Sequence, residues 1–204
     1  MNMIIIMGLP GAGKPSVLSG VENMGWKVLN YGTLMFEIAQ KAYKLTNRDE
    51  MRKLPVEKQK KVQEEVAHRL SQEKGKVILD THCSIRTAKG YLPGLPFSLL
   101  EKLQVDSIAL ITATPEEIMG RRKTDDTRVR DPEPIDSVRE HDMMNKSLLA
   151  AYAAHRGCPA RIIYNHDGKL EEAVRQLKQM LECSPSGCTL EPSGAASAMQ
   201  AARR

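Results

Sequence analysis

Short hydrophobic runs alternate with helical patterns along most of the chain. Five of these runs predict strands, at Met3–Met7, Lys27–Asn30, Lys76–Thr81, Ser107–Thr112 and Arg161–Tyr164. Buried runs separated by helix-length segments are typical of βαβ units, in which helices cover both faces of a parallel sheet. The pattern therefore predicts an α/β fold around a five-stranded parallel sheet.

The helical period is clearest in two segments. Apolar residues recur every four positions within Val62–Leu70, and every three or four positions within Leu170–Leu181. This spacing gathers them on one face of an amphipathic helix. We expect the apolar face of both helices to belong to the core.

Three segments show neither pattern. Cys83–Pro96 is rich in glycine and proline, and Lys123–Pro134 is charged and contains prolines, so neither fits a strand or a core helix. We expect both to be functional. Residues 183–204 are rich in Ser, Gly, Ala and Pro without a periodic apolar face, which predicts a disordered tail with no catalytic role.

The composition is that of a globular protein. With 204 residues, 41% hydrophobic and 27% charged, the chain fits one folded domain, which we place at residues 1–182. It contains no apolar run approaching the roughly 18 residues that span a bilayer, so we expect a soluble, cytoplasmic protein without a membrane partner. The net charge of +5 is modest, and two Phe and one Trp offer little base stacking, which disfavours a nucleic-acid partner.

Cysteine and histidine do not indicate a metal centre. The four cysteines match no paired metal-binding spacing, and we expect free thiols. Three histidines, His141, His155 and His166, have no acidic or metal partner by spacing. His68 lies in a charged helical segment, and all four are expected on the surface.

The strongest motif is a glycine-rich loop that follows the first strand and precedes a helical segment. In such a phosphate loop, backbone N–H groups and a helix N-terminus surround a phosphate, and a lysine reaches its outer oxygens. The predicted ATP-binding residues are Gly8, Leu9, Pro10, Gly11, Ala12, Gly13, Lys14, Pro15 and Ser16.

Pro15 departs from the usual motif, which has Ser or Thr after the lysine. A proline supplies neither a hydroxyl for magnesium nor an N–H for phosphate, although it suits the first turn of a helix. Ser16 is the nearest hydroxyl and a weak candidate for the metal. We therefore expect weaker nucleotide binding or slower transfer than a Ser or Gly at position 15 would give.

Together with the phosphate loop, four further segments resemble the archaeal-type adenylate kinases over residues 1 to about 182. They are Leu29–Gly32, Arg48–Leu54, Asp80–His82 with Ile85–Thr87, and Gly90–Pro96. The resemblance implies a P-loop NTPase three-layer sandwich. It also implies an acceptor-binding region at about 31–75 and an arginine-rich lid at about 120–134.

The same resemblance implies an activity and its ligands. ATP and AMP would be converted reversibly into two ADP with Mg²⁺ as cofactor, and a homotrimer becomes a plausible assembly. Arg52, His82 and Arg86 would contact AMP, and Asp80 would hold the magnesium through water. The catalytic group would be Lys14, Arg86, Arg121, Arg128 and Arg130.

Several clustered arginines suit phosphoryl transfer, because they stabilise the charge that develops on the equatorial oxygens. Thr124 stands where the family usually has another arginine, so the lid could be one cation short. Three alternatives stay open. They are a kinase for another nucleoside monophosphate, a nucleotide-binding protein whose turnover is impaired by Pro15, and an RNA-associated protein that uses the basic lid.

Overall fold

The computed structural model describes residues 2–124 and 133–183. Within these residues the strands are β1 (Asn2–Gly8), β2 (Lys27–Asn30), β3 (Lys76–Thr81), β4 (Ser84–Thr87), β5 (Gly90–Pro93), β6 (Ser107–Thr112) and β7 (Ala160–Tyr164). The α-helices are α1 (Lys14–Ser19), α2 (Tyr31–Tyr43), α3 (Arg48–Arg52), α4 (Val56–Ser71), α5 (Phe97–Leu100), α6 (Pro115–Lys123), α7 (Ile135–Arg156) and α8 (Leu170–Glu182). A short 3₁₀ helix, η1, covers Glu22–Met24.

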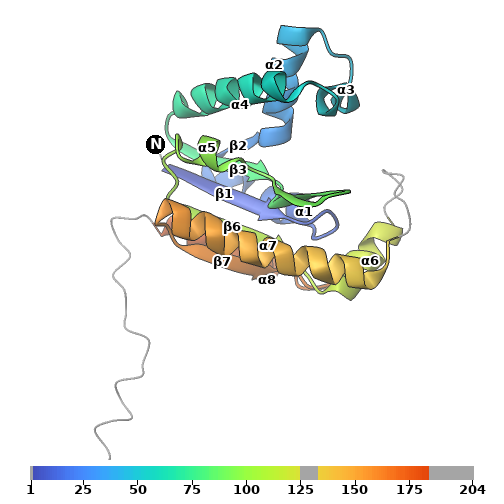
Figure 1. The fold of residues 1–204 in the computed structure, drawn as a ribbon. Helices are drawn as coiled ribbons and strands as arrows, with labels where there is room; N and C mark the ends of the chain where they lie inside the picture. The colour runs from blue at the N-terminus through green and yellow to red at the C-terminus, as the bar shows by residue number, and fades with distance from the viewer. Residues whose placement is uncertain (1, 125–132, 184–204) are drawn as a thin grey trace, which may run out of the picture.

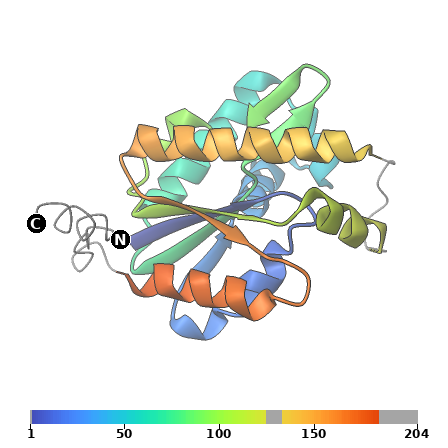
Figure 2. The ribbon, with the colours of Figure 1, turned by 90° about the horizontal axis from the view of Figure 1, so that it is seen from below.

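Five strands form one parallel sheet in the order β2-β3-β1-β6-β7. All five predicted strands are confirmed, with bounds that differ by at most one residue. The central strand β1 is buried along nearly its whole length, which fits its continuous run of apolar residues. In Figure 2, α7 and α8 lie on opposite faces of the sheet. The three-layer α/β arrangement is therefore confirmed.

Each face of the sheet has its own core. On one face, alternate strand residues such as Met3, Ile5 and Met7 belong to the same buried cluster as Val62 and Val66 of α4. On the other face, Ile4 and Ile6 pack with apolar residues of α1 and α8, among them Val17 and Leu177. This alternation follows from the two-residue period of a strand. Both predicted amphipathic helices are therefore confirmed.

The expectation of no strand within Cys83–Pro96 was wrong. β4 and β5 pair antiparallel as a hairpin, with Gly90 at φ +113° where the chain turns back. The Tyr152 hydroxyl of α7 fastens the base of the hairpin: it lies 3.1 Å from the carbonyl oxygens of both Cys83 and Leu95, and it accepts the Leu95 N–H at 3.2 Å. These contacts come from far along the chain, so the local pattern gave no sign of the strands.

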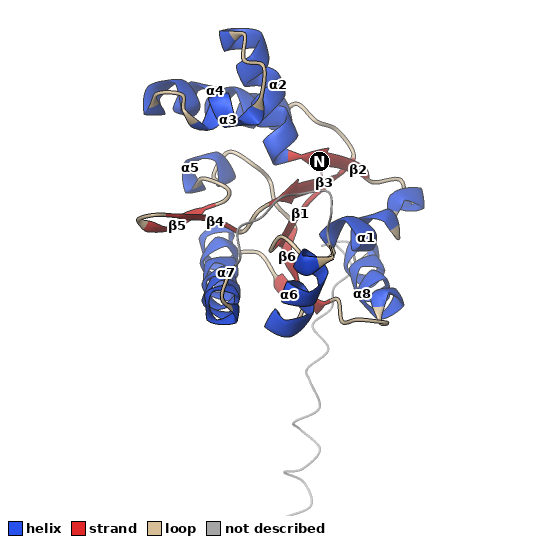
Figure 3. Ribbon diagram, turned by 90° about the vertical axis from the view of Figure 1, so that its right-hand side faces the viewer, coloured by secondary structure: helices blue, strands red, loops and turns tan. Residues whose placement is uncertain are grey.

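Helices α2, α3 and α4 stand together beyond the β2 edge of the sheet (Figure 1 and Figure 3). Asn30 caps α2 by accepting the Thr33 N–H at 2.9 Å, and Asn47 caps α3 by accepting the Glu50 N–H at 3.0 Å. Side-chain caps of this kind satisfy amide groups that a helix leaves without partners. The two caps thus fix where both helices begin.

Two predictions fall on residues outside the described ranges. They are the central part of the lid, at 125–132, and the disordered tail beyond Cys183. In the described part of the chain, no helix is long and apolar enough to cross a membrane.

Candidate active site

The phosphate loop runs between β1 and α1. A tight turn closes it, with the Ala12 N–H donating to the Leu9 carbonyl at 3.0 Å. Gly13 is the N-cap of α1 with φ +75°, and a Cβ at this position would clash with the side chain of Asn165. Glycine is therefore required at position 13 for both its backbone angle and its close contact.

Pro15 occupies the first turn of α1, where a proline is compatible with a helix. The expectation that the fold tolerates Pro15 is confirmed. Both Pro15 and Ser16 are exposed. The side chains at these two positions are thus accessible at the start of α1.

Lys14 does not extend away from the protein in this structure. Its ammonium group forms an ion pair with Asp80 at the end of β3 and donates to the Thr81 carbonyl at 2.5 Å. Burial lowers the pKa of Lys14 below its ordinary value, although the Asp80 carboxylate opposes this shift. The lysine is therefore held at the carboxyl ends of β1 and β3, beside the phosphate loop.

The loop after β7 supports the phosphate loop from the side. Asn165 is buried and donates from Nδ2 to the Ala12 carbonyl at 3.0 Å. Arg121 of α6 donates from Nη2 to the Asn165 carbonyl at 2.7 Å and to Asp167 at 2.6 Å. Arg121 Nη1 lies near Gly13 and is buried without a hydrogen-bond partner among the described residues. An unpaired cationic donor at this point is suited to an anionic ligand in the loop.

Glu133 joins two further arginines. Its Oε1 accepts from Arg86 Nη1 at 2.6 Å, and its Oε2 accepts from Arg122 Nη1 at 2.5 Å. Arg122 also donates from Nε to the Pro10 carbonyl at 2.8 Å. Burial favours the neutral acid, but hydrogen bonds from Ser137 and the two arginines outweigh it and lower the pKa of Glu133. The charged carboxylate thus links the hairpin to the phosphate loop.

The hairpin that carries Arg86 is attached to α7 by a buried polar group. Ser84 Oγ donates to Asn145 Oδ1 at 2.6 Å and lies 2.9 Å from His141 Nε2. His141 is buried, which corrects the expectation that it lies on the surface, and burial lowers its pKa. A hydroxyl between two fixed partners holds β4 at a defined position on the helix.

Two other histidines have acidic partners that spacing could not show. His155 Nε2 lies 3.2 Å from Glu101, and His166 Nδ1 lies 3.0 Å from Glu117. Glu117 forms a capping box at the start of α6 and also accepts the Asp167 N–H at 2.8 Å. Burial favours its neutral form, but these hydrogen bonds dominate and lower the pKa of Glu117 to about 2. The carboxylate therefore fixes the loop after β7 to α6.

The predicted acceptor side is less tightly connected. Arg48 of α3 donates from Nη2 to the Thr33 hydroxyl at 2.9 Å, above the first turn of α2. Arg52 lies at the end of α3, but its side chain is outside the description. His82 follows β3 directly and is exposed. On this side of the site, Arg48 is therefore the arginine that contacts the start of α2 among the described side chains.

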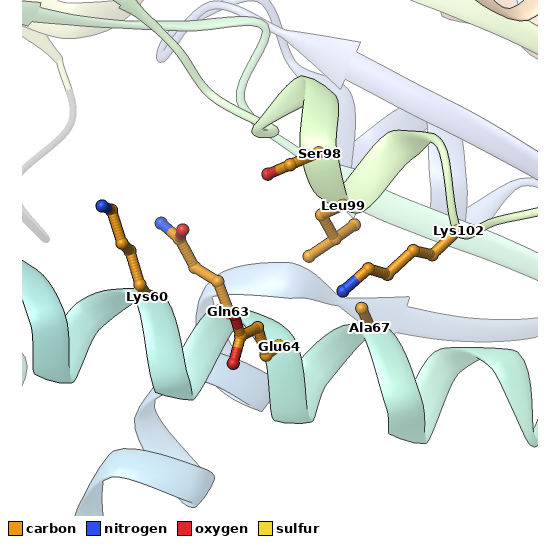
Figure 4. Close-up of a pocket in the computed structure, with 7 residues that line it drawn as sticks. All are labelled: Lys60, Gln63, Glu64, Ala67, Ser98, Leu99 and Lys102. Atoms are coloured by element: carbon orange, nitrogen blue, oxygen red, sulfur yellow. The ribbon is translucent and has the colours of Figure 1, made fainter.

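A small cavity of about 170 Å³ lies between α4 and α5, and Figure 4 shows Leu99 and Lys102 extending toward α4. None of the phosphate-loop residues lines it; the lining residues are Lys60, Gln63, Glu64, Ala67, Ser98, Leu99 and Lys102. The cavity is therefore separate from the phosphate site.

Of the predicted site residues, the structure brings Lys14 and Asp80 into direct contact. Arg86 is linked to the phosphate loop through Glu133 and Arg122, and Arg121 is linked to it through Asn165. Arg128 and Arg130 lie outside the described residues. Sequence reasoning missed the supporting residues Arg122, Glu133, Asn165 and Asp167. Only the arginine-rich composition of the lid segment hinted at Arg122. The cysteines described by the structure, Cys83, Cys158 and Cys183, are free, as expected.

Comparison with known proteins places these features in a wider group. A protein family described as "AAA domain" matches residues 7–139. The fold is similar to a shikimate kinase from Bacteroides thetaiotaomicron, with a TM-score of 0.55 at 12% identity over 89% of this chain and 98% of the other. A shikimate kinase from Acinetobacter baumannii is similar with a TM-score of 0.53 at 18% identity, over 88% of this chain and 92% of the other. The fold and the phosphate loop thus place the chain in the P-loop class of α/β proteins.

The sequence relatives are more specific. An adenylate kinase of Methanopyrus kandleri is 46% identical over 85% of this chain and 94% of its own length. An adenylate kinase of Methanothermobacter thermautotrophicus is 40% identical over 89% of this chain and 100% of its own length. The chain belongs to the adenylate kinase family, which confirms the resemblance seen in its motifs.

Proposed function

We propose that this protein transfers the terminal phosphoryl group of ATP to AMP, reversibly, to give two ADP. The observation that carries the proposal is the convergence of cationic groups from three elements around one phosphate loop. Lys14 comes from the loop itself, Arg121 and Arg122 come from α6, and Arg86 reaches the same region through Glu133. Membership of the adenylate kinase family supports the same reaction.

Each group has a role that follows from its position. The loop N–H groups and Lys14 would hold the ATP phosphates, for which the lysine exchanges Asp80 for phosphate oxygens. Arg86 would bind the AMP phosphate, because its hydrogen bonds to Glu133 and Ser137 both use Nη1 and its side chain is half exposed. The Nε and Nη2 edge of the guanidinium then matches a phosphate bidentately.

No general base is needed for this transfer. A phosphate oxygen of AMP is already ionised at neutral pH, and it attacks the γ-phosphorus of ATP while the bond to the β-phosphate oxygen breaks. Catalysis then depends on position and on charge stabilisation. Arg121 and Arg122 are placed to stabilise that charge, and we propose that Arg128 and Arg130 of the lid join them.

The site is compatible with a magnesium ion that arrives with the nucleotide. Magnesium in kinases keeps several waters and uses one or two protein carboxylates beside the phosphates. Asp80 supplies one largely shielded carboxylate at the end of β3, and the described residues contain no cluster of three or more acidic, His or Cys ligands. We propose that Asp80 holds the ion through water and that Ser16 is a weaker candidate. The ion would neutralise phosphate charge.

A coupled assay that offers AMP, CMP, UMP and GMP with ATP tests the function. We expect ADP formation with AMP to exceed that with each other monophosphate. Preference for a pyrimidine nucleotide or GMP would contradict the adenylate assignment. The trimer implied by the resemblance stays a prediction, which the mass of the protein in solution would test.

A further inference from the structure

A continuous series of polar contacts runs from the phosphate loop to α3. Lys14 pairs with Asp80, whose other oxygen accepts from Asn30 Nδ2 at 2.7 Å. Asn30 Oδ1 in turn accepts the N–H and the hydroxyl of Thr33 at 2.9 and 3.1 Å. The same hydroxyl of Thr33 accepts from Arg48 at 2.9 Å. Five side chains therefore connect the loop with the helices beyond β2.

Asn30 is the residue of this series that connects the sheet to α2. It is the last residue of β2 and the N-cap of α2, so no linker separates the strand from the helix. Asn30 and Asp80 are neighbours in the parallel register of β2 and β3. The Thr33 N–H can only donate, so the amide oxygen must face it and the amide nitrogen must face Asp80. One planar amide thus contacts both the sheet edge and the first turn of α2.

We propose that Asn30 is a positioning residue through which ATP binding raises the affinity for AMP. The inference rests on the proposed function. When donor phosphates draw Lys14 away, Asp80 exchanges this partner for the metal-bound water proposed above, and its interaction with Asn30 changes. Because Thr33 fixes the other end of the amide, this change acts on the first turn of α2 and, through Thr33, on Arg48. The arrangement of Lys14 on Asp80 and its proposed arrangement on donor phosphates would be the two states that coupling between sites requires.

The test measures AMP affinity by titration calorimetry, with and without a non-hydrolysable ATP analogue and magnesium. Asn30→Ser keeps an effective helix cap but has no amide to reach Asp80, and Asn30→Asp keeps the cap but cannot donate to a carboxylate. Asn47→Ser is the matched control, because Asn47 caps α3 in the same way without contacting Asp80.

We expect the analogue to tighten AMP binding by about fivefold or more in the unaltered protein and in Asn47→Ser, the lower end of common coupling. In both Asn30 variants, the ratio of the AMP dissociation constants without and with the analogue should fall to about one. Their KM for AMP at saturating ATP should rise. In Asn30→Ser, kcat and the melting temperature should change little, whereas Asn30→Asp should lower the melting temperature, because it places a second carboxylate beside Asp80. A ratio that is unchanged in the Asn30 variants, or already near one in the unaltered protein, would overturn the proposal.

Failure of the proposed function would look different. If the unaltered protein forms no ADP from ATP and AMP, the assignment of the reaction fails, whatever the binding ratio. If ADP forms normally and only the ratio is insensitive to Asn30, the reaction stands and the coupling role is wrong.

Discussion

The two sides of the site are built in different ways. The donor side, formed by the phosphate loop, α6 and the loop after β7, is held by contacts such as Asn165 to Ala12 and Arg122 to Pro10, which are buried or partly buried. On the acceptor side, formed by α2, α3 and the hairpin, the contacts of Arg48 and Arg86 are mostly exposed. Exposed contacts are weaker and easier to rearrange. The donor side is thus built to stay in place, whereas on the acceptor side the Arg48 contact between α3 and α2 can rearrange around a ligand.

The largest effect should come from the donor side. Lys14→Met removes the cation that we propose contacts the transferred phosphate, and loss of one such group should lower kcat by about 10² to 10³. Steady-state kinetics with AMP and ATP measures it. Lys27→Met is the control, because among the described residues the Lys27 side chain pairs with Glu73 alone, at the surface. Equal losses in the two variants would contradict the role of Lys14.

The next effect separates the two sides. Arg86→Lys keeps the charge but removes the planar fork, and loss of a charge-assisted hydrogen bond should raise the KM for AMP by about 10- to 100-fold. The KM for ATP should change little. Arg139→Lys is the matched control, since Arg139 pairs only with surface carboxylates. If Arg86→Lys weakened ATP and AMP equally, the distinction between donor and acceptor sides would break down.

Restoring the donor side should have a positive effect. Pro15→Ser and Pro15→Gly each supply a backbone N–H that can donate a hydrogen bond to a phosphate oxygen. This bond should raise kcat/KM by up to about tenfold. Kinetics with varied ATP and magnesium distinguishes the two, because only serine adds a hydroxyl. Pro115→Ser, at the equivalent first turn of α6, should leave kcat/KM unchanged. Unchanged or lower values in both Pro15 variants would show that Pro15 does not limit the enzyme.

The smallest effect concerns the rigidity of the donor side. The pKa of Glu117 is about 2 in the folded protein against an ordinary 4.5, so its stabilising effect is full above pH 4.5 and disappears as pH falls toward 2. Glu117→Gln should lose about 1 kcal/mol of stability at neutral pH and show a shallower acid transition over that window.

Circular dichroism during acid titration measures this transition. Glu172→Gln, in the first turn of α8, is the control that should keep the original slope. An acid transition in Glu117→Gln that is as steep as in the unaltered protein would exclude Glu117 as its source.

The sequence predicted what depends on local pattern. The five strands were found because each is a short apolar run, and Lys14 was found because its motif is contiguous. The hairpin was missed because Tyr152 and Asn145, far along the chain, hold it in place. Glu133 and Asn165 were missed for a similar reason, since Glu133 reaches Arg86, 47 positions away, and Asn165 reaches Ala12, 153 positions away. Their roles arise from packing rather than from local sequence.

The fastening of the hairpin by Tyr152 has a consequence for the entropy of binding. Fixing a free arginine side chain on a ligand opposes binding by about 2 kcal/mol. Tyr152 anchors the base of the hairpin, and Glu133 already holds one nitrogen of Arg86. Much of the ordering of this arginine therefore takes place when the chain folds, before any nucleotide arrives. An incoming phosphate meets a guanidinium that already points in one direction.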